Sequence, residues 1–186
     1  MTIQKIEVGM LQTNCYILTI NKQSIIIDPG AEPEKIINNI NNEVVGILIT
    51  HHHFDHIGAL NEIKDKYNCP VYDKNNLKEG LNKIGPFEFT LISTPGHKSD
   101  LVSYLFNDNL FCGDFIFESS IGRWDLDTGS FKQMQESIQE ILKYNNLIIY
   151  PGHGNSTTLN KERNNLISYL WIRMIINNFF IKLYKI

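Results

Sequence analysis

The sequence predicts one mixed α/β domain, in which short strands alternate with helices. Two observations support this prediction. Apolar stretches with strand-like composition are separated by turn residues, and several of them are linked by segments with helical periodicity. Clusters of histidine and aspartate also stand directly behind predicted strands. A chain of 186 residues is long enough for a domain with its own core.

The N-terminal part of the chain begins with strands that are rich in isoleucine. We predict them over residues 3–8, 15–20 and 24–28, because turn residues separate these three stretches. Pro33 suits the first position of a helix, since proline lacks the N–H that would be unpaired there. Ile36 and the isoleucines that follow at helical spacing would form the buried face of this helix.

The next two elements lead into and out of a histidine-rich segment. Residues 44–49 form a continuous apolar run, which favours a buried strand. Residues 57–67 then predict a helix, in which Leu60, Ile63 and Tyr67 are spaced for burial on one face.

Strands dominate the next part of the chain, and one clear helix follows. The strands are predicted over residues 70–72, 87–93, 101–106 and 110–112. Ser130 is a good N-cap for a helix that reaches about Tyr144, and Gln133 completes a capping-box pattern. An apolar strand over residues 147–150 precedes a Pro-Gly-His segment.

Composition and charge exclude several functional classes. The net charge of −3, with no run of basic residues, gives no electrostatic footprint for nucleic acid. Cys15, Cys69 and Cys112 are few and irregularly spaced, which argues against a disulfide framework and for a reducing compartment. The first residues alternate like a strand and lack the features of a signal peptide. We therefore expect a cytoplasmic protein.

The C-terminal segment, residues 166–186, is strongly apolar but is interrupted by polar residues such as Arg173 and Lys182. These interruptions argue against an integral membrane segment. We expect one folded domain over residues 1–165, followed by an amphipathic helix over 166–186 that packs on the same domain. A dimer contact or a contact with a membrane surface are the alternatives for this helix. The expected assembly is a monomer or a homodimer.

Five of the six histidines fall into a pattern that is typical of metal ligands. With two aspartates they give seven candidates: His51, His53, Asp55, His56, His97, Asp114 and His153. Imidazole and carboxylate are typical of catalytic zinc sites, whereas structural zinc sites are usually rich in cysteine. Seven ligands are enough for two metal ions. The ring of His52 should point away from its neighbours in an extended segment, so we leave it out of the site.

This ligand set predicts hydrolytic chemistry. Two divalent ions would lower the pKa of water to about 7 and polarise a substrate carbonyl, so that a metal-bound hydroxide attacks it. Histidines bind as neutral rings, and Asp55 and Asp114 are the expected catalytic carboxylates. A carboxylate can bridge two ions, and Asp114, beside Gly113, is the natural candidate.

Residues 50–56, Thr-His-His-His-Phe-Asp-His, resemble the T-H-x-H-x-D-H signature of the metallo-β-lactamase superfamily. The resemblance covers roughly residues 3 to 165. It implies an αββα sandwich, in which two mixed β-sheets are flanked by helices and the metals lie at one edge. It also implies that the first metal is held by His51, His53 and His97, that the second is held by Asp55, His56 and His153, and that Asp114 bridges both.

Four further segments look like the glyoxalase II branch of this superfamily: residues 13–16, 27–30, 94–97 and 121–125. That resemblance implies a small-molecule substrate, a hydroxyacylglutathione thioester, and two divalent ions that are most often zinc, with iron or manganese as the other options. Larger enzymes of the branch carry a helical C-terminal domain that helps to bind glutathione. Too few residues follow His153 for such a domain.

Three further residues have two interpretations each. Asp28 either orients a ligand through a hydrogen bond or simply ends a strand at a Pro-Gly turn. Arg123 and Asp125 either pair with each other near the mouth of the site or form a structural ion pair. Cys112 is expected to be a buried, small apolar residue rather than a thiol catalyst.

Three other functions compete with the thioesterase hypothesis. Persulfide dioxygenases resemble this branch and use a single iron, held by two histidines and an aspartate, so the protein would then be an oxidoreductase. The superfamily also includes metal-dependent nucleases, which the acidic net charge disfavours. A binding protein without catalysis is the fourth reading, and the complete ligand set argues against it.

Overall fold

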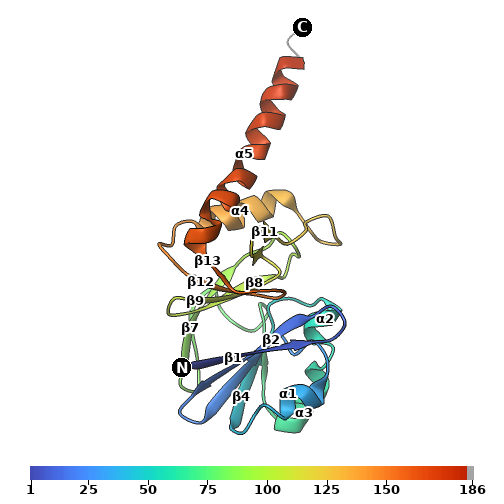
Figure 1. Ribbon diagram of the computed structural model, residues 1–186, viewed down its shortest axis with the longest axis vertical. Helices are drawn as coiled ribbons and strands as arrows, with labels where there is room; N and C mark the ends of the chain where they lie inside the picture. The colour runs from blue at the N-terminus through green and yellow to red at the C-terminus, as the bar shows by residue number, and fades with distance from the viewer. Residues whose placement is uncertain (184–186) are drawn as a thin grey trace.

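The computed structural model describes residues 1–183, and it describes side chains as far as Trp171. Two β-sheets are stacked face to face, with helices on both outer faces (Figure 1). The helices α1 and α3 lie on one side, and α4 and the start of α5 lie on the other. This arrangement is the αββα sandwich that the resemblance implies.

The first sheet contains the strands of the N-terminal part in their order along the chain. They are β1 (Thr2–Val8), β2 (Thr13–Ile20), β3 (Gln23–Ile27), β4 (Glu43–Leu48) and β5 (Val71–Tyr72). The pairs β1–β2 and β2–β3 are antiparallel, whereas β3–β4 and β4–β5 are parallel. Helix α1 (Pro33–Ile37) connects β3 to β4, and the helices α2 (Phe54–Ile57) and α3 (Leu60–Tyr67) connect β4 to β5.

The second sheet has the order β13-β12-β9-β8-β7-β6. Its strands are β6 (Gly80–Ile84), β7 (Phe87–Ser93), β8 (Val102–Phe106), β9 (Asn109–Gly113), β12 (Ile148–Pro151) and β13 (Thr157–Thr158). Only β12 and β9 pair in parallel, so this sheet is also mixed. A small separate hairpin consists of β10 (Ile116–Phe117) and β11 (Ser120–Ile121).

Three apolar clusters hold the four layers together. The central cluster lies between the sheets and includes Leu18, Phe89 and Tyr104, all almost completely buried. A second cluster, around Ile36 and Ile63, lies between the first sheet and the helices α1 and α3. The third joins the second sheet to α4 (Phe131–Ile141) and the start of α5 (Leu159–Leu183). Apolar burial of this kind is the main favourable contribution to folding.

Helix α4 shows how the sequence encodes an element. The Ser130 hydroxyl accepts a hydrogen bond from the Gln133 N–H, which confirms the predicted N-cap. Met134, Ile138 and Ile141 recur at helical spacing and are fully buried. The cap therefore determines where the helix begins, and the apolar stripe determines which face packs on the second sheet.

Helix α5 begins against the body of the domain and then runs away from the sandwich (Figure 1). Leu166 is fully buried, and Tyr169 and Leu170 pack on the same apolar cluster. The expectation that residues 166–186 form an amphipathic helix packed on the domain concerns mostly side chains that lie outside the described residues, so it stays a prediction.

Among the helices in the described part of the chain, none combines the length and apolar character needed to cross a membrane.

Several elements differ from the sequence prediction. The two-residue strands β10, β11 and β13 were not predicted, and helix α5 begins at Leu159 rather than at residue 166. Strand β6 was not predicted, because Gly80–Ile84 lacks a clear apolar alternation and is stabilised by pairing with β7 at the edge of the sheet. The helix predicted over residues 57–67 begins at Leu60, as α3, and a separate short helix, α2, ends at Ile57. A Cβ atom on Gly58 would lie 2.3 Å from the Gly30 carbonyl oxygen, so the close approach of these two loops requires glycine.

Candidate metal centre

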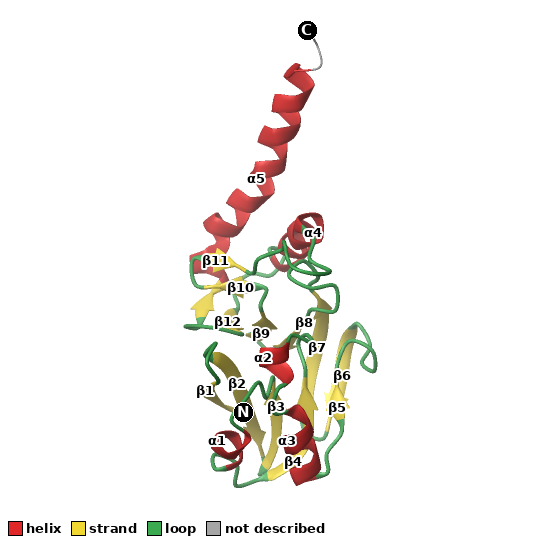
Figure 2. Cartoon of the chain, turned by 90° about the vertical axis from the view of Figure 1, so that its right-hand side faces the viewer, coloured by secondary structure: helices red, strands yellow, loops and turns green. Residues whose placement is uncertain are grey.

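Four strand ends position the candidate ligands. Strands β7, β9 and β12 run in the same direction within the second sheet, and each is followed directly by a ligand-bearing loop. Strand β4 of the first sheet leads into the histidine-rich segment, which continues as α2. Helix α2 lies at the side of the sandwich where the two sheets meet (Figures 1 and 2). Ligands from four distant parts of the chain therefore converge on one edge.

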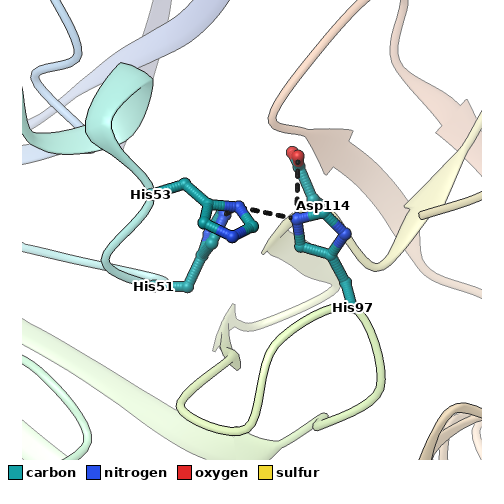
Figure 3. A group of neighbouring side chains, drawn as sticks. All are labelled: His51, His53, His97 and Asp114. Carbon is teal, nitrogen blue, oxygen red and sulfur yellow. Dashed lines mark hydrogen bonds and ion pairs between the residues drawn. The ribbon is translucent and has the colours of Figure 1, made fainter. Parts of the chain in front are cut away.

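The first group of ligands consists of His51, His53, His97 and Asp114, whose ligand atoms all lie within 4.8 Å of one another. The Nδ1 atom of His53 lies 3.0 Å from the Nε2 atom of His51 and 2.9 Å from the Nε2 atom of His97. The Oδ2 atom of Asp114 lies 3.4 Å from the same Nε2 atom of His97 (Figure 3). Three imidazole nitrogens thus face one small volume.

The second group consists of Asp55, His56 and His153. The Nε2 atom of His153 lies 3.2 Å from Asp55 Oδ2, and the Nε2 atom of His56 lies 3.6 Å from the same oxygen. Asp114 Oδ1 lies 3.3 Å from His56 Nε2 and 3.5 Å from His153 Nε2, whereas Asp114 Oδ2 faces His97. The two oxygens of Asp114 therefore face different groups, as a bridging carboxylate requires.

Four of the histidine rings are oriented by an oxygen atom outside the cluster. The contacts of their Nδ1 atoms are His51 with Thr50 Oγ1 (3.1 Å), His56 with Asp28 Oδ2 (2.9 Å), His97 with the Arg123 carbonyl (2.7 Å) and His153 with the Leu11 carbonyl (3.0 Å). A carbonyl or carboxylate oxygen can only accept, and the Thr50 hydroxyl already donates its proton to Asp28, so Nδ1 carries the proton in all four rings. In a neutral ring this leaves the lone pair of Nε2 directed into the cluster, which is the tautomer that metal ligation needs.

Two buried polar atoms of the cluster indicate that the site binds cations. His56 Nε2 and Asp114 Oδ1 are buried without a hydrogen-bond partner. Most buried polar atoms in native proteins have a partner, and an orphaned one calls for an explanation. A divalent ion between these ligands would satisfy both atoms. The donor set, nitrogen and carboxylate oxygen without thiolate, suits zinc, iron or manganese.

The charges in the second group are strongly coupled. Burial alone would lower the pKa of His56, but the nearby carboxylates of Asp28 and Asp114 outweigh it and raise the value to about 10. The pKa of His153 is also raised to about 10, because Asp114 and Asp55 outweigh its burial. Burial would raise the pKa of Asp55, but contacts with His153 and His56 hold it at about 2. Without metal, protons on these rings therefore compensate the carboxylates.

In the first group of ligands, the pKa values of two histidines are lowered instead of raised. Burial is the main reason why the pKa of His51 lies well below its ordinary value, and the neighbouring His56 adds to the effect. Burial also lowers the pKa of His53. These two rings are therefore neutral at pH 7 and ready to act as ligands without losing a proton.

A cavity of about 570 Å³ lies over the candidate ligands. His53, Asp55, His97, Asp114 and His153 line it, together with Leu11, Phe54, Phe117, Ser120, Ile121, Gly122, Arg123 and Leu126. Most of these other residues are apolar. Phe54 lies on the rim and is 76% exposed, an unusual position for a large apolar side chain. Such exposed apolar surface at a cavity is typical of a ligand-binding site.

The other residues named from the sequence have different places. Asp28 is buried and contacts both His56 and Thr50, so its side chain orients the site. The guanidinium of Arg123 forms an exposed pair with Asp125 at 2.8 Å and lines the cavity, while its backbone carbonyl holds His97.

Two residues of the same region lie apart from the site. The ring of His52 points away from the cluster and contacts Asp73 and Asp100. Cys112 is completely buried, and burial is the main cause that raises the pKa of its thiol to about 12.

Sequence reasoning assigned no role to several residues that contact the ligands. Thr13 donates a hydrogen bond from its hydroxyl to Asp55, and Asn14 contacts the loop that carries His153. Thr50 links Asp28 to His51. Thr13 and Asn14 stand at the start of a strand, and only the packing of that strand against the end of β12 brings them to the site.

A family model and several curated proteins are similar to this chain in sequence. A family model described as the metallo-beta-lactamase superfamily matches residues 8–73 and 70–153. A probable metallo-hydrolase of Bacillus subtilis, YqgX, is 33% identical over 86% of this chain and 93% of its own length. The hydroxyacylglutathione hydrolase GloC of Haemophilus influenzae is 27% identical over 88% of this chain and 95% of its own length.

Solved structures show the same architecture. The B3 metallo-beta-lactamase BLEG-1 superimposes with a TM-score of 0.84 and 32% identity, covering 88% of this chain and 97% of its own. The protein TTHA1623, solved in a di-iron-bound form, has a TM-score of 0.79 and 28% identity, covering 87% of this chain and 98% of its own.

Proposed function

Because this chain belongs to the metallo-β-lactamase superfamily, we propose that it is a dinuclear metal-dependent hydrolase that cleaves thioesters of the hydroxyacylglutathione type. Members of the superfamily are mostly hydrolases, and the histidine and aspartate cluster is consistent with a dinuclear site. The observation that carries the proposal is the pair of ligand groups that share Asp114 beneath a cavity large enough for a small molecule.

The ligands divide into two sets in this proposal. His51, His53 and His97 would hold the first ion, Asp55, His56 and His153 would hold the second, and Asp114 would be shared by both groups. When bound, two divalent ions lower the pKa of water and polarise the carbonyl group of a substrate.

The chain itself contributes charge and orientation. Asp55 and Asp114 bring two negative charges to four positive ones, so the loaded site keeps a net positive charge that favours an anion. The carbonyl of Arg123 and the carboxylate of Asp28 hold His97 and His56 in fixed tautomers. A thiolate leaves more readily than an alkoxide, and a site of net positive charge stabilises it as it departs.

No side chain is needed as a nucleophile in this mechanism. Cys112 is fully buried with its thiol pKa raised to about 12, mainly by burial, so it is a thiol that neither ionises nor reaches the cavity. Ser120 lines the cavity, but no contact that the structure describes joins it to a histidine base. An attacking water therefore accounts for the site better than a serine or cysteine nucleophile.

The thioester specificity is supported by likeness to GloC, a hydroxyacylglutathione hydrolase, and by four segments that resemble the glyoxalase II branch. The test is a panel of thioesters, including S-lactoylglutathione, run on enzyme whose metal content has been measured, with a β-lactam as a control substrate. Metal-dependent release of thiol, without β-lactam hydrolysis, is the expected result. Thioesters that all remain intact with two metals bound would overturn the proposal.

A second candidate function is a mononuclear iron persulfide dioxygenase, which would make this protein an oxidoreductase. The relative TTHA1623 was solved in a di-iron-bound form, which supports iron as the metal, although with two ions rather than one. Metal analysis of protein purified without added metal, combined with oxygen consumption on a persulfide, separates the two functions. One iron per chain together with oxygen uptake would favour the dioxygenase.

We propose zinc as the metal, a cytoplasmic location, a small-molecule substrate rather than nucleic acid, and a monomer or homodimer as the assembly. For the organisation of the chain, we propose a hydrolase domain over residues 1–165 and, over residues 166–186, an amphipathic helix that packs on the same domain.

A further inference from the structure

The start of strand β2 lies directly against the loop that carries His153. Thr13 and His153 form an isolated antiparallel bridge between the two sheets. The backbone N–H of Asn14 donates to the carbonyl of Gly152 at 2.7 Å. The first sheet therefore touches the end of β12, which belongs to the second sheet, at the edge where the metal ligands meet.

The side chain of Asn14 tightens this junction. Asn14 is completely buried, and its Nδ2 atom donates to the carbonyls of Pro151 and Gly154, both at 2.9 Å. These two carbonyls lie on either side of the Gly152-His153 dipeptide. One amide group thus holds the backbone before and after His153, and the Tyr16 hydroxyl donates a second hydrogen bond to the Pro151 carbonyl at 2.6 Å.

The same short stretch of chain holds a second ligand. The Thr13 hydroxyl donates to Asp55 Oδ2 at 3.0 Å, and the Leu11 carbonyl accepts from Nδ1 of His153 at 3.0 Å. Two of the three ligands in the second group, Asp55 and His153, are therefore oriented by residues 11–14.

The first group is oriented from elsewhere. His51 contacts Thr50, and His97 contacts the Arg123 carbonyl. Neither contact involves β2. A change at the start of β2 should therefore reach one metal position and spare the other.

We infer that Thr13 and Asn14 are positioning residues that set the affinity of the second metal position independently of the first. The inference rests on the proposed two-metal site. Residues that orient metal ligands typically change metal affinity by about 10- to 100-fold when they are replaced. Substitutions here should thus produce a protein that binds the first ion tightly and the second one weakly.

The test uses Asn14→Asp in the full chain. Aspartate has the shape of asparagine, but its carboxylate would face the carbonyls of Pro151 and Gly154 without a proton to donate. Asn82→Asp is the matched control, because the Nδ2 atom of Asn82 also donates to two carbonyls, at 2.7 and 2.8 Å. Asn82 lies on β6, at the opposite edge of the second sheet from β12 and β13.

Each protein is stripped of metal and titrated with Co²⁺, with the visible absorption of the bound ion as the signal, and the number of ions bound is measured directly. We expect wild type and Asn82→Asp to bind two ions. We expect Asn14→Asp to bind the first ion with unchanged affinity and the second at least tenfold more weakly. Equal weakening of both ions, or two ions bound as in wild type, would refute the inference.

Thr13 provides a milder variant in case the buried charge of Asn14→Asp prevents folding. Thr13→Val removes the hydroxyl that contacts Asp55 and keeps the shape, whereas Thr13→Ser keeps the hydroxyl. Selective loss of the second ion in Thr13→Val, with rescue in Thr13→Ser, supports the inference, and equal behaviour of both variants contradicts it. The readout is metal binding, so a protein without thioesterase activity would refute the proposed substrate and leave this test intact. A wild-type protein that binds one ion would refute the two-metal proposal itself.

Discussion

Replacement of Asp28 by asparagine tests how the protein controls the tautomer of His56. Asp28 Oδ1 accepts from the backbone N–H of Thr50 at 2.8 Å, and Oδ2 accepts from the Thr50 hydroxyl at 2.6 Å and from His56 Nδ1 at 2.9 Å. An amide has only one accepting oxygen. In Asp28→Asn, one N–H group must therefore face another donor, or the ring of His56 must take up the other tautomer with its proton on Nε2. In that tautomer the nitrogen that faces Asp55 and Asp114 is no longer free to bind metal.

The size of the effect follows from burial. Asp28 and His56 are almost completely buried, so water cannot replace the lost contact. A buried group left without its partner costs about 1–3 kcal/mol, which corresponds to roughly 5- to 140-fold in affinity at 1.4 kcal/mol per tenfold. Loss of the Asp28 charge also lowers the pKa of His56 and so reduces competition from protons. Loss of the same Asp28 charge also weakens the attraction for the cation. These two electrostatic effects on metal affinity oppose each other, so the change of the His56 tautomer is the main cause of the expected weakening.

The assay is a Co²⁺ titration of the metal-free protein. We expect the second ion to bind about 10- to 100-fold more weakly in Asp28→Asn than in wild type. Asp100→Asn is the matched control, because Asp100 contacts Nδ1 of His52 at 2.7 Å, and the ring of His52 lies outside the ligand cluster. Wild-type affinity for both ions in Asp28→Asn would show that the carboxylate does not control the ligand.

Three further predictions follow from the same structure. His53→Ala should lower both metal content and turnover, because His53 contacts two other ligand rings; elemental analysis and a thioesterase assay measure this, and unchanged values would contradict it. His56 and His153, whose pKa values are raised to about 10, hold protons at pH 7 that must leave before the neutral rings can bind metal. Metal uptake at pH 7 should therefore release protons, and metal affinity should rise as the pH increases from 7 towards 10; a weakly buffered titration that shows neither would refute the charge assignment. Ile138→Ala should lower the free energy of unfolding by about 2–5 kcal/mol, because Ile138 is fully buried in the third apolar cluster. Denaturant unfolding measures this, and a loss well below 1 kcal/mol would show that the neighbouring side chains fill the space that Ile138 leaves.

Local patterns in the sequence predicted much of the architecture. The apolar run at residues 44–49 and the capped helix that starts at Ser130 were recognisable, because burial and capping leave periodic signals in neighbouring residues. Ligand chemistry was equally visible, because five of the six histidines fall into one pattern together with two aspartates. Strand β6 left no such signal, because it is held mainly by its hydrogen bonds to β7.

What the amino-acid sequence determined by itself was the identity of the candidate ligands and the class of chemistry they suit. Only the tertiary structure decided which oxygen of Asp114 faces which group, which nitrogen of each ring points inward, and that Asp28 contacts His56 instead of only ending a strand. It also brought Asn14 to the His153 loop, more than a hundred residues away along the chain. The physical reason is that hydrogen bonds act over about 3 Å in space, and the sequence records distance only along the chain.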